Sequence, residues 1–178
     1  MPNARPFWKQ PGYIIAQICT IFAIMAGVYW ATFTGYKSVI DFHNIKYDRA
    51  SYRLQSALES ELLRNIGELE KHFDSWGAID ETNITGNLPS IDSSIWQSSR
   101  KNELIFSIPT SVVLGIGEFN KYTTRAIKAH SEQTISREDM MSVLITQRDK
   151  ARGEILPTLE SSRDALRSRL KQYNIDLN

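Results

Sequence analysis

Residues 13 to 34 read YIIAQICTIFAIMAGVYWATFT, and this stretch decides the fold class. No charged side chain occurs between Lys9 and Lys37. A helix needs roughly 20 apolar residues to cross a bilayer, so the stretch is long enough. Aromatic rings favour the headgroup region, and they lie near both ends: Phe7, Trp8 and Tyr13, then Tyr29, Trp30 and Tyr36. We therefore predict a short tail over residues 1–12 and a transmembrane helix over residues 13–36.

A cleaved signal peptide is the other interpretation of this apolar stretch. Its apolar core is normally about 7–15 residues long and ends in a small-x-small site. The stretch here is longer and contains no A-x-A sequence, which favours a retained helix. Basic residues are more numerous after the span (Lys37, Lys46, Arg49 and Arg53) than before it (Arg5 and Lys9). This bias predicts a cytoplasmic C-terminal domain.

Small side chains recur at steps of three or four within the span: Ala16, Thr20, Ala23, Gly27, Ala31 and Thr34. Such a stripe lets two helix backbones approach closely in a membrane. The chain has one predicted span, so a protein partner for the stripe must come from another chain. We expect self-association through this face. Gln17, Thr20 and Thr34 are the candidates for a wetter, pore-lining side.

Residues 37–178 have the pattern of an all-α domain. Leu58, Leu62, Ile66, Leu69 and Phe73 repeat at helical spacing, which predicts a long helix continuing from the membrane. Turn-forming residues fill positions 74–94. Asp92, Ser93 and Ser94 are candidates to cap a short helix that bears Ile95 and Trp96. Pro109 is predicted to start a longer helix whose apolar residues are Val112, Ile116, Phe119 and Tyr122. Ser136 with Asp139 is a capping-box-like start for a last helical stretch to Leu170, with a kink or split at Pro157. The expected architecture is a bundle of four or five helices with its apolar stripes inward.

Composition narrows the classes of function. The formal net charge is +1, so no global attraction to nucleic acid or anionic lipid is expected. Cys19 is the only cysteine, and His43, His72 and His130 are widely separated, so the sequence predicts no disulfide framework and no metal site. No glycine-rich nucleotide-binding loop is present, and no cofactor is expected.

One short pattern has the residue types of catalysis. Arg125 and His130 are separated by four residues, the R-x(4)-H spacing of HEPN ribonucleases. In that chemistry the histidine acts as general acid or base and the arginine stabilises charge on phosphate, in a cleft usually shared by two domains. The sequence SEQTIS follows His130, so we expect the helix to fray there and let the histidine turn back.

The N-terminal span, the all-helical domain and the lone R-x(4)-H together resemble the small membrane-anchored, HEPN-like accessory protein of type VI-B CRISPR systems. That family enhances an RNA-guided, RNA-targeting effector in antiviral defence. The resemblance covers the whole chain and implies a homo-oligomeric ring, octameric in its described form, that encloses a pore and depolarises the bacterial inner membrane. Arg125 and His130 match the motif, but Ala126 replaces the polar residue common after the arginine in active ribonucleases.

Two other classes of function remain open. A membrane-tethered HEPN ribonuclease would use Arg125 and His130 from two subunits to cleave RNA. A non-enzymatic single-pass scaffold would recruit a partner through its exposed bundle, without conductance or cleavage.

Overall fold

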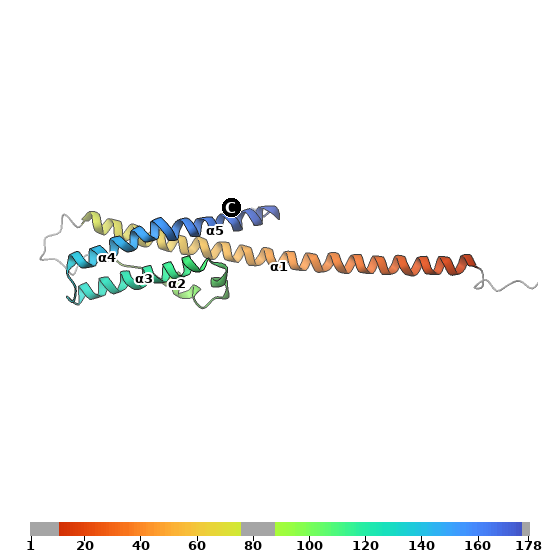
Figure 1. Cartoon of the computed structure of the whole chain (residues 1–178), viewed down its shortest axis with the longest axis horizontal. Helices are drawn as coiled ribbons and strands as arrows, with labels where there is room; N and C mark the ends of the chain where they lie inside the picture. The colour runs from red at the N-terminus through yellow and green to blue at the C-terminus, as the bar shows by residue number, and fades with distance from the viewer. Residues whose placement is uncertain (1–10, 76–87, 176–178) are drawn as a thin grey trace, which may run out of the picture. The chain divides into compact units, whose positions relative to one another are not determined.

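Helices are the regular secondary structure of the part of the chain that the structure describes. The computed structural model describes residues 11–75 and 88–175, and no strand occurs in these two ranges. Figure 1 shows the helices coloured along the chain. The predicted all-α fold class is confirmed for this part of the chain. The structure divides into two compact units, residues 1–46 and residues 47–178.

The first helix, α1, runs from Pro11 to Ser75 and has 65 residues. It begins two residues before the predicted span, with a proline whose fixed backbone angle suits a helix start. This helix is long enough and apolar enough to cross a membrane. None of the residues in its most apolar stretch is buried. Large apolar side chains in this stretch are exposed. The exposed fraction is 61% for Ile15, 64% for Phe22 and 73% for Trp30. Water is a poor environment for such a surface.

Within the second unit, residues 47–75 of α1 supply one side of the core. The predicted apolar repeat is confirmed there, since Leu58, Leu62, Ile66 and Leu69 are all at least 98% buried. Helix α5 (Leu156–Gln172) lies alongside this part of α1, as Figure 1 shows. Arg163 pairs with Glu59 across this contact, and Arg167 Nη2 donates to Tyr52 Oη at 3.0 Å.

Between α1 and residue 150 the described part of this unit has two short helices and two longer ones. They are α2 (Ser94–Ser99), the 3₁₀ helix η3 (Glu103–Ser107), α3 (Thr110–Ser131) and α4 (Arg137–Lys150). Helix α3 begins directly after Pro109, as predicted. The predicted cap of α4 is confirmed, because Asp139 N donates to Ser136 Oγ at 3.0 Å. Residues 88–93 precede α2 without regular structure, and the rest of the predicted loop after Ser75 lies outside the described residues.

The buried face of α3 differs from the predicted face at one position. Val112, Ile116 and Phe119 are buried as expected, but Tyr122 is 41% exposed. Thr123 takes the interior place and is fully buried. Its hydroxyl donates to the carbonyl oxygen of Phe119 at 2.6 Å, so burial leaves no unpaired donor.

The sequence predicts a kink or split at Pro157, and the structure has a change of helix type just before it, with helical residues continuing from Arg137 to Gln172. A π-helical segment, η4 (Ala151–Ile155), separates α4 from α5. Proline has no N–H to donate to the carbonyl four residues earlier. The Thr158 hydroxyl donates to the carbonyl of Glu154 at 2.7 Å, which satisfies one of the backbone groups near this break.

Gly115 allows α3 and η4 to pack closely. A Cβ atom at Gly115 would lie 2.8 Å from Cγ1 and 2.9 Å from Cδ1 of Ile155. Ile155 is itself 97% buried, so its side chain has little room to move. The close contact therefore depends on the missing side chain.

We expect Gly115→Val to lower the free energy of unfolding by about 1–3 kcal/mol, because the added methyl groups overpack the contact with Ile155. The measurement is urea unfolding in detergent followed by circular dichroism. The matched control is Gly67→Ala on α1, where no atom lies within 4 Å of an added Cβ. That variant is expected to be about 0–1 kcal/mol more stable, since alanine favours a helix over glycine. Equal stability of the two variants would contradict this account of the packing.

Candidate functional site

The small residues of the span share one face of α1. At roughly 100° per residue, all six lie within about 40° of Gly27 around the helix axis. Each is exposed. A Cβ atom at Gly27 would have nothing within 4 Å, so the space next to this face is open to a neighbouring helix.

The three candidates for the pore side differ in their hydrogen bonding. The Thr20 hydroxyl donates to the carbonyl of Ala16 at 2.9 Å, which leaves the side chain compatible with lipid. Thr34 is exposed, and its carbonyl accepts from the Ser38 hydroxyl at 3.0 Å. Gln17 Nε2 donates to Tyr13 Oη at 3.1 Å. An amide can make four hydrogen bonds, so Gln17 has the greatest need of further polar partners.

Arg125 and His130 both lie on α3 but do not share a face. Five residues correspond to roughly 140° around a helix. Helix α3 ends at Ser131, within the SEQTIS segment where fraying is predicted, but His130 is itself helical and does not turn back toward Arg125. The chain turns back only at Gln133, whose φ of 58° is left-handed. His130 Nδ1 lies 3.4 Å from the carbonyl oxygen of Ile135, after this turn.

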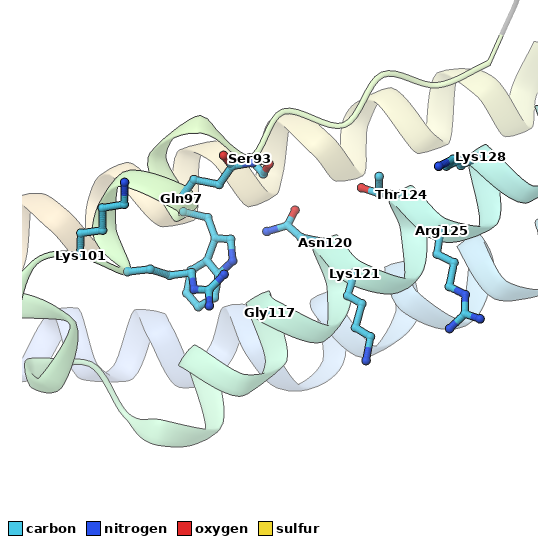
Figure 2. Close-up of a pocket in the computed structure, with 11 residues that line it drawn as sticks. Ser93, Gln97, Lys101, Gly117, Asn120, Lys121, Thr124, Arg125 and Lys128 are labelled. Atoms are coloured by element: carbon cyan, nitrogen blue, oxygen red, sulfur yellow. Dashed lines mark hydrogen bonds between the residues drawn. The ribbon is translucent and has the colours of Figure 1, made fainter.

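Arg125 instead belongs to a basic groove between α2 and α3. The groove has a volume of about 810 Å³. Five cationic side chains line it: Arg100, Lys101, Lys121, Arg125 and Lys128. No aspartate or glutamate is among the residues lining the groove, and Figure 2 shows Lys121 and Arg125 leaving α3 in the same direction. We call this feature the α2–α3 groove. His130 does not line it.

Sequence reasoning missed this groove, although half of it has a signal in the sequence. Lys121, Arg125 and Lys128 follow one another at steps of four and three, which places three cations on one helical face. The other wall carries Arg100 and Lys101, at the end of α2 and in the turn after it. No spacing rule connects these two segments, so only the fold brings them together.

The floor of the groove depends on a close contact between α2 and α3. Trp96 is 92% buried, and a Cβ atom at Gly117 would lie 3.3 Å from its Cζ2. The missing side chain at Gly117 thus leaves room for the indole ring against α3. Close packing of a rigid ring gives the groove a fixed base.

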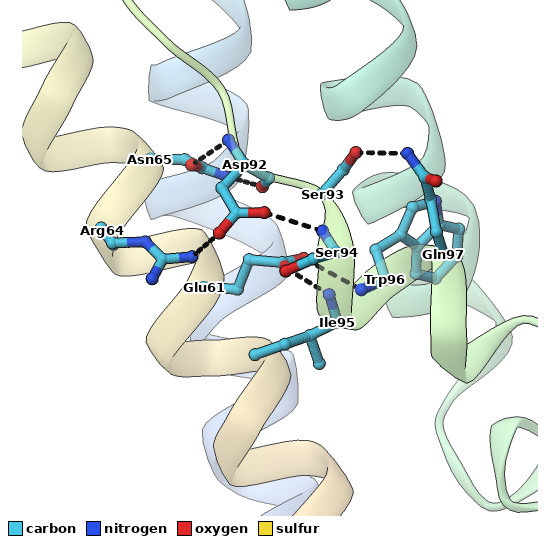
Figure 3. A network of polar contacts seen from close by, with 9 residues as sticks. All are labelled: Glu61, Arg64, Asn65, Asp92, Ser93, Ser94, Ile95, Trp96 and Gln97. Atoms are coloured by element: carbon cyan, nitrogen blue, oxygen red, sulfur yellow. Dashed lines mark hydrogen bonds and ion pairs between the residues drawn. The ribbon is translucent and has the colours of Figure 1, made fainter.

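The N-terminus of α2 is capped from α1. Ser93 occupies the N-cap position but makes no side-chain cap, which differs from the prediction for this residue. Glu61, 97% buried on α1, accepts instead from Ile95 N at 2.6 Å and from Trp96 N at 3.1 Å (Figure 3). One carboxylate therefore satisfies two N–H groups that the first turn of α2 leaves free.

Asp92 makes a second connection between α1 and α2. Its Oδ1 accepts from Ser94 N at 2.8 Å, as the sequence predicted, and its carboxylate pairs with Arg64. The side chain of Asn65 bonds both backbone groups of Asp92, at 2.6 and 3.0 Å (Figure 3). The hydrogen bonds from Ser94, and then the charge of Arg64, hold the pKa of the Asp92 carboxyl below its ordinary value.

Glu118 is the acidic residue closest in sequence to the groove cations of α3, and its ion-pair partner lies on another helix, α4. Lys150 Nζ on α4 lies 2.7 Å from Glu118 Oε2. This hydrogen bond and the Lys150 charge lower the pKa of Glu118, and the same contact raises the pKa of Lys150. Glu118 is thereby ionised and engaged with α4, so it does not neutralise the groove by direct pairing.

We expect Glu61→Ala to lower the free energy of unfolding by about 1–3 kcal/mol, because it leaves the N–H groups of Ile95 and Trp96 without their acceptor. The measurement is urea unfolding of the variant and the wild type under the same conditions. Glu68→Ala is the control, since Glu68 pairs only with exposed Lys71 on the same helix and such pairs contribute about 0–1 kcal/mol. Similar losses for both variants would rule out a special role for Glu61.

The lowered pKa of Asp92 predicts a dependence on pH. Its carboxylate stabilises the folded state above the unfolded pKa, close to 3.8, and this contribution is lost as the pH falls through the lower folded pKa. Asp92→Asn is neutral at every pH. We expect its urea midpoint to lie below that of the wild type by a constant amount between about pH 5 and pH 7, and the difference to vanish in more acidic solution. A difference that does not change with pH would contradict the assignment.

Comparisons with known proteins find no similarity: the sequence matches no protein-family model and no curated protein, and the structure matches no solved structure.

Proposed function

We propose that this chain is a single-pass protein of the bacterial inner membrane that assembles through its span into a homo-oligomeric pore. Its helical bundle, of HEPN-like type, faces the cytoplasm. Opening of the pore depolarises the membrane as an accessory step of antiviral defence by an RNA-guided type VI-B CRISPR effector. The ring is octameric in the described members of the family that the layout resembles.

The observation that carries this proposal is the uncharged part of α1 between Tyr13 and Tyr36, every residue of which is exposed. An apolar helix surface on this scale requires lipid or other helices around it. Its small-residue face is suited to close helix contact in a membrane, where packing rather than hydrophobic burial drives association. With one candidate span in the described residues, identical neighbours are the simplest source of such helices.

The pore-lining assignment is supported best at Gln17. Its side-chain amide has four hydrogen-bonding positions, and the structure gives it the single partner Tyr13. A water-filled lumen would supply the other partners, whereas lipid would not. Gln17 lies roughly 80° around α1 from Gly27, so one face can pack against a neighbour while the other faces the lumen.

A membrane-tethered ribonuclease is the second candidate, favoured by the position of Arg125 in the α2–α3 groove. The groove would hold RNA phosphates, and His130 would come from another subunit because the two residues do not share a face of α3. Purified protein that cleaves RNA, and loses this activity in both Arg125→Ala and His130→Ala, would establish this function in place of the first.

The size of the detergent-solubilised particle tests the pore proposal directly. We expect a mass of many subunits by light scattering corrected for bound detergent. Gly27→Leu is expected to reduce assembly because it fills the space that a neighbouring backbone needs. Ala26→Leu is the matched control, since it adds a leucine at mid-span roughly 100° away from the stripe.

A wild-type monomer or dimer would overturn the pore proposal and leave the scaffold and ribonuclease hypotheses. A large particle that Gly27→Leu and Ala26→Leu alter equally would overturn only the proposed packing face.

A further inference from the structure

We propose that the α2–α3 groove binds a small organic ligand with two or three linked phosphate groups, of the nucleoside diphosphate or triphosphate class. This inference goes beyond the proposed function, because it concerns only the second unit and requires neither a pore nor RNA cleavage.

The charge of the groove is the first argument. The whole chain has a formal net charge of +1, yet five cations and no carboxylate line this one concave surface. Among the described residues, Arg100, Lys101 and Arg125 have no ion-pair partner, whereas six other basic side chains pair at 2.7 Å or less: Arg64, Lys71, Arg148, Lys150, Arg152 and Arg163. Lys128 is paired with Glu132 at 3.6 Å, but a cluster that keeps three cations without ion-pair partners raises the local positive potential and attracts an anion of several charges.

The geometry of the cations suits linked phosphates. Lys121 and Arg125 are four residues apart on one helix, so their Cβ atoms are about 6 Å apart and both can reach one phosphate group. Lys128 follows one turn later on the same face, next to Glu132 at 3.6 Å. Arg100 and Lys101 line the groove from the end of α2 and the turn after it. An arginine on each wall can make the bidentate contacts that phosphate oxygens accept.

The size of the groove and the charge of its surroundings favour a small ligand over a long nucleic acid. A volume of about 810 Å³ lies within the usual range of roughly 300–1,000 Å³ for small-molecule sites. A long polyanion would extend past the groove onto a chain that is nearly neutral overall, where Glu118 and Glu132 flank the α3 cations. Long nucleic acids bind tightly through many phosphate contacts spread over a wide basic surface.

The neutral side chains of the groove favour an organic ligand over inorganic phosphate alone. Asn120 lines the groove. Its amide has both donors and an acceptor, so it can pair with a hydroxyl or amino group of a ligand as well as with phosphate oxygens. Gln97 and Thr124 line the same groove and add neutral hydrogen-bonding groups (Figure 2).

The test is titration calorimetry with the full-length protein in nanodiscs of neutral phosphatidylcholine. The probes are adenosine triphosphate, inorganic tripolyphosphate and a short single-stranded RNA. We expect adenosine triphosphate to bind with one site per chain and more tightly than tripolyphosphate. Binding should fall by at least about a hundredfold in the double variant Lys121→Gln/Arg125→Gln, because two charge-assisted contacts are lost.

A second double variant tests the opposite wall independently. Arg100→Gln/Lys101→Gln should weaken the binding of adenosine triphosphate to a similar degree. The matched control is Arg53→Gln/Lys171→Gln, which removes one arginine and one lysine from exposed positions outside the groove. The control should bind like the wild type, and circular dichroism checks that all the variants are folded.

Three results would overturn the proposal: no binding of adenosine triphosphate at millimolar concentration, equal loss in the control and groove variants, or RNA binding more tightly than the nucleotide. Particle mass in detergent is measured separately, so failure of nucleotide binding can be distinguished from failure of the pore proposal.

Discussion

The buried carboxylate of Glu61 is the contact on which the arrangement of the second unit depends. Helix α2 has six residues and is too short to be stable alone. The Glu61 carboxylate accepts hydrogen bonds from two N–H groups of α2. The same bonds give this buried carboxylate the partners that it requires. Arg64 and Asn65 lie one turn after Glu61 on α1, and they bind Asp92, two residues before the start of α2. The position of α2 against α1 is thus set by polar contacts.

The orientation of α2 in turn creates the groove. With its N-terminus held by α1, the helix directs Trp96 against α3, where Gly117 leaves room for the ring. The end of α2 then brings Arg100 and Lys101 to the groove that Lys121 and Arg125 line from α3. Acidic partners on other helices engage the cations elsewhere in the unit, such as Glu59 with Arg163 and Glu118 with Lys150. An almost neutral chain therefore presents a strongly basic concavity.

Two patterns of apolar residues along α1 correspond to two environments. Between Tyr13 and Tyr36 the helix is apolar on all sides and exposed, which is the pattern of a membrane span. From Leu58 to Leu69 only one stripe is apolar, and it is buried against the other helices of the second unit. The first pattern suits lipid or other helices around the whole circumference, and the second leaves a polar outer face for water. The same helix therefore suits a lipid environment at one end and an aqueous one at the other.

The sequence by itself determined the features that depend on local chemistry. The apolar span, the stripe at Leu58 to Leu69, the cap at Ser136, the start of α3 after Pro109 and the break near Pro157 all follow from residues within a few positions of one another. Only the tertiary structure decided that Glu61 caps α2 from 34 residues away, that Thr123 rather than Tyr122 is buried, and that cations from two segments share a groove. Arg125 and His130 lie on different faces because α3 continues through His130, and five residues on a regular helix correspond to roughly 140°. Hydrogen bonds and burial depend on where helices pack in space, and linear spacing constrains this only within a single helix.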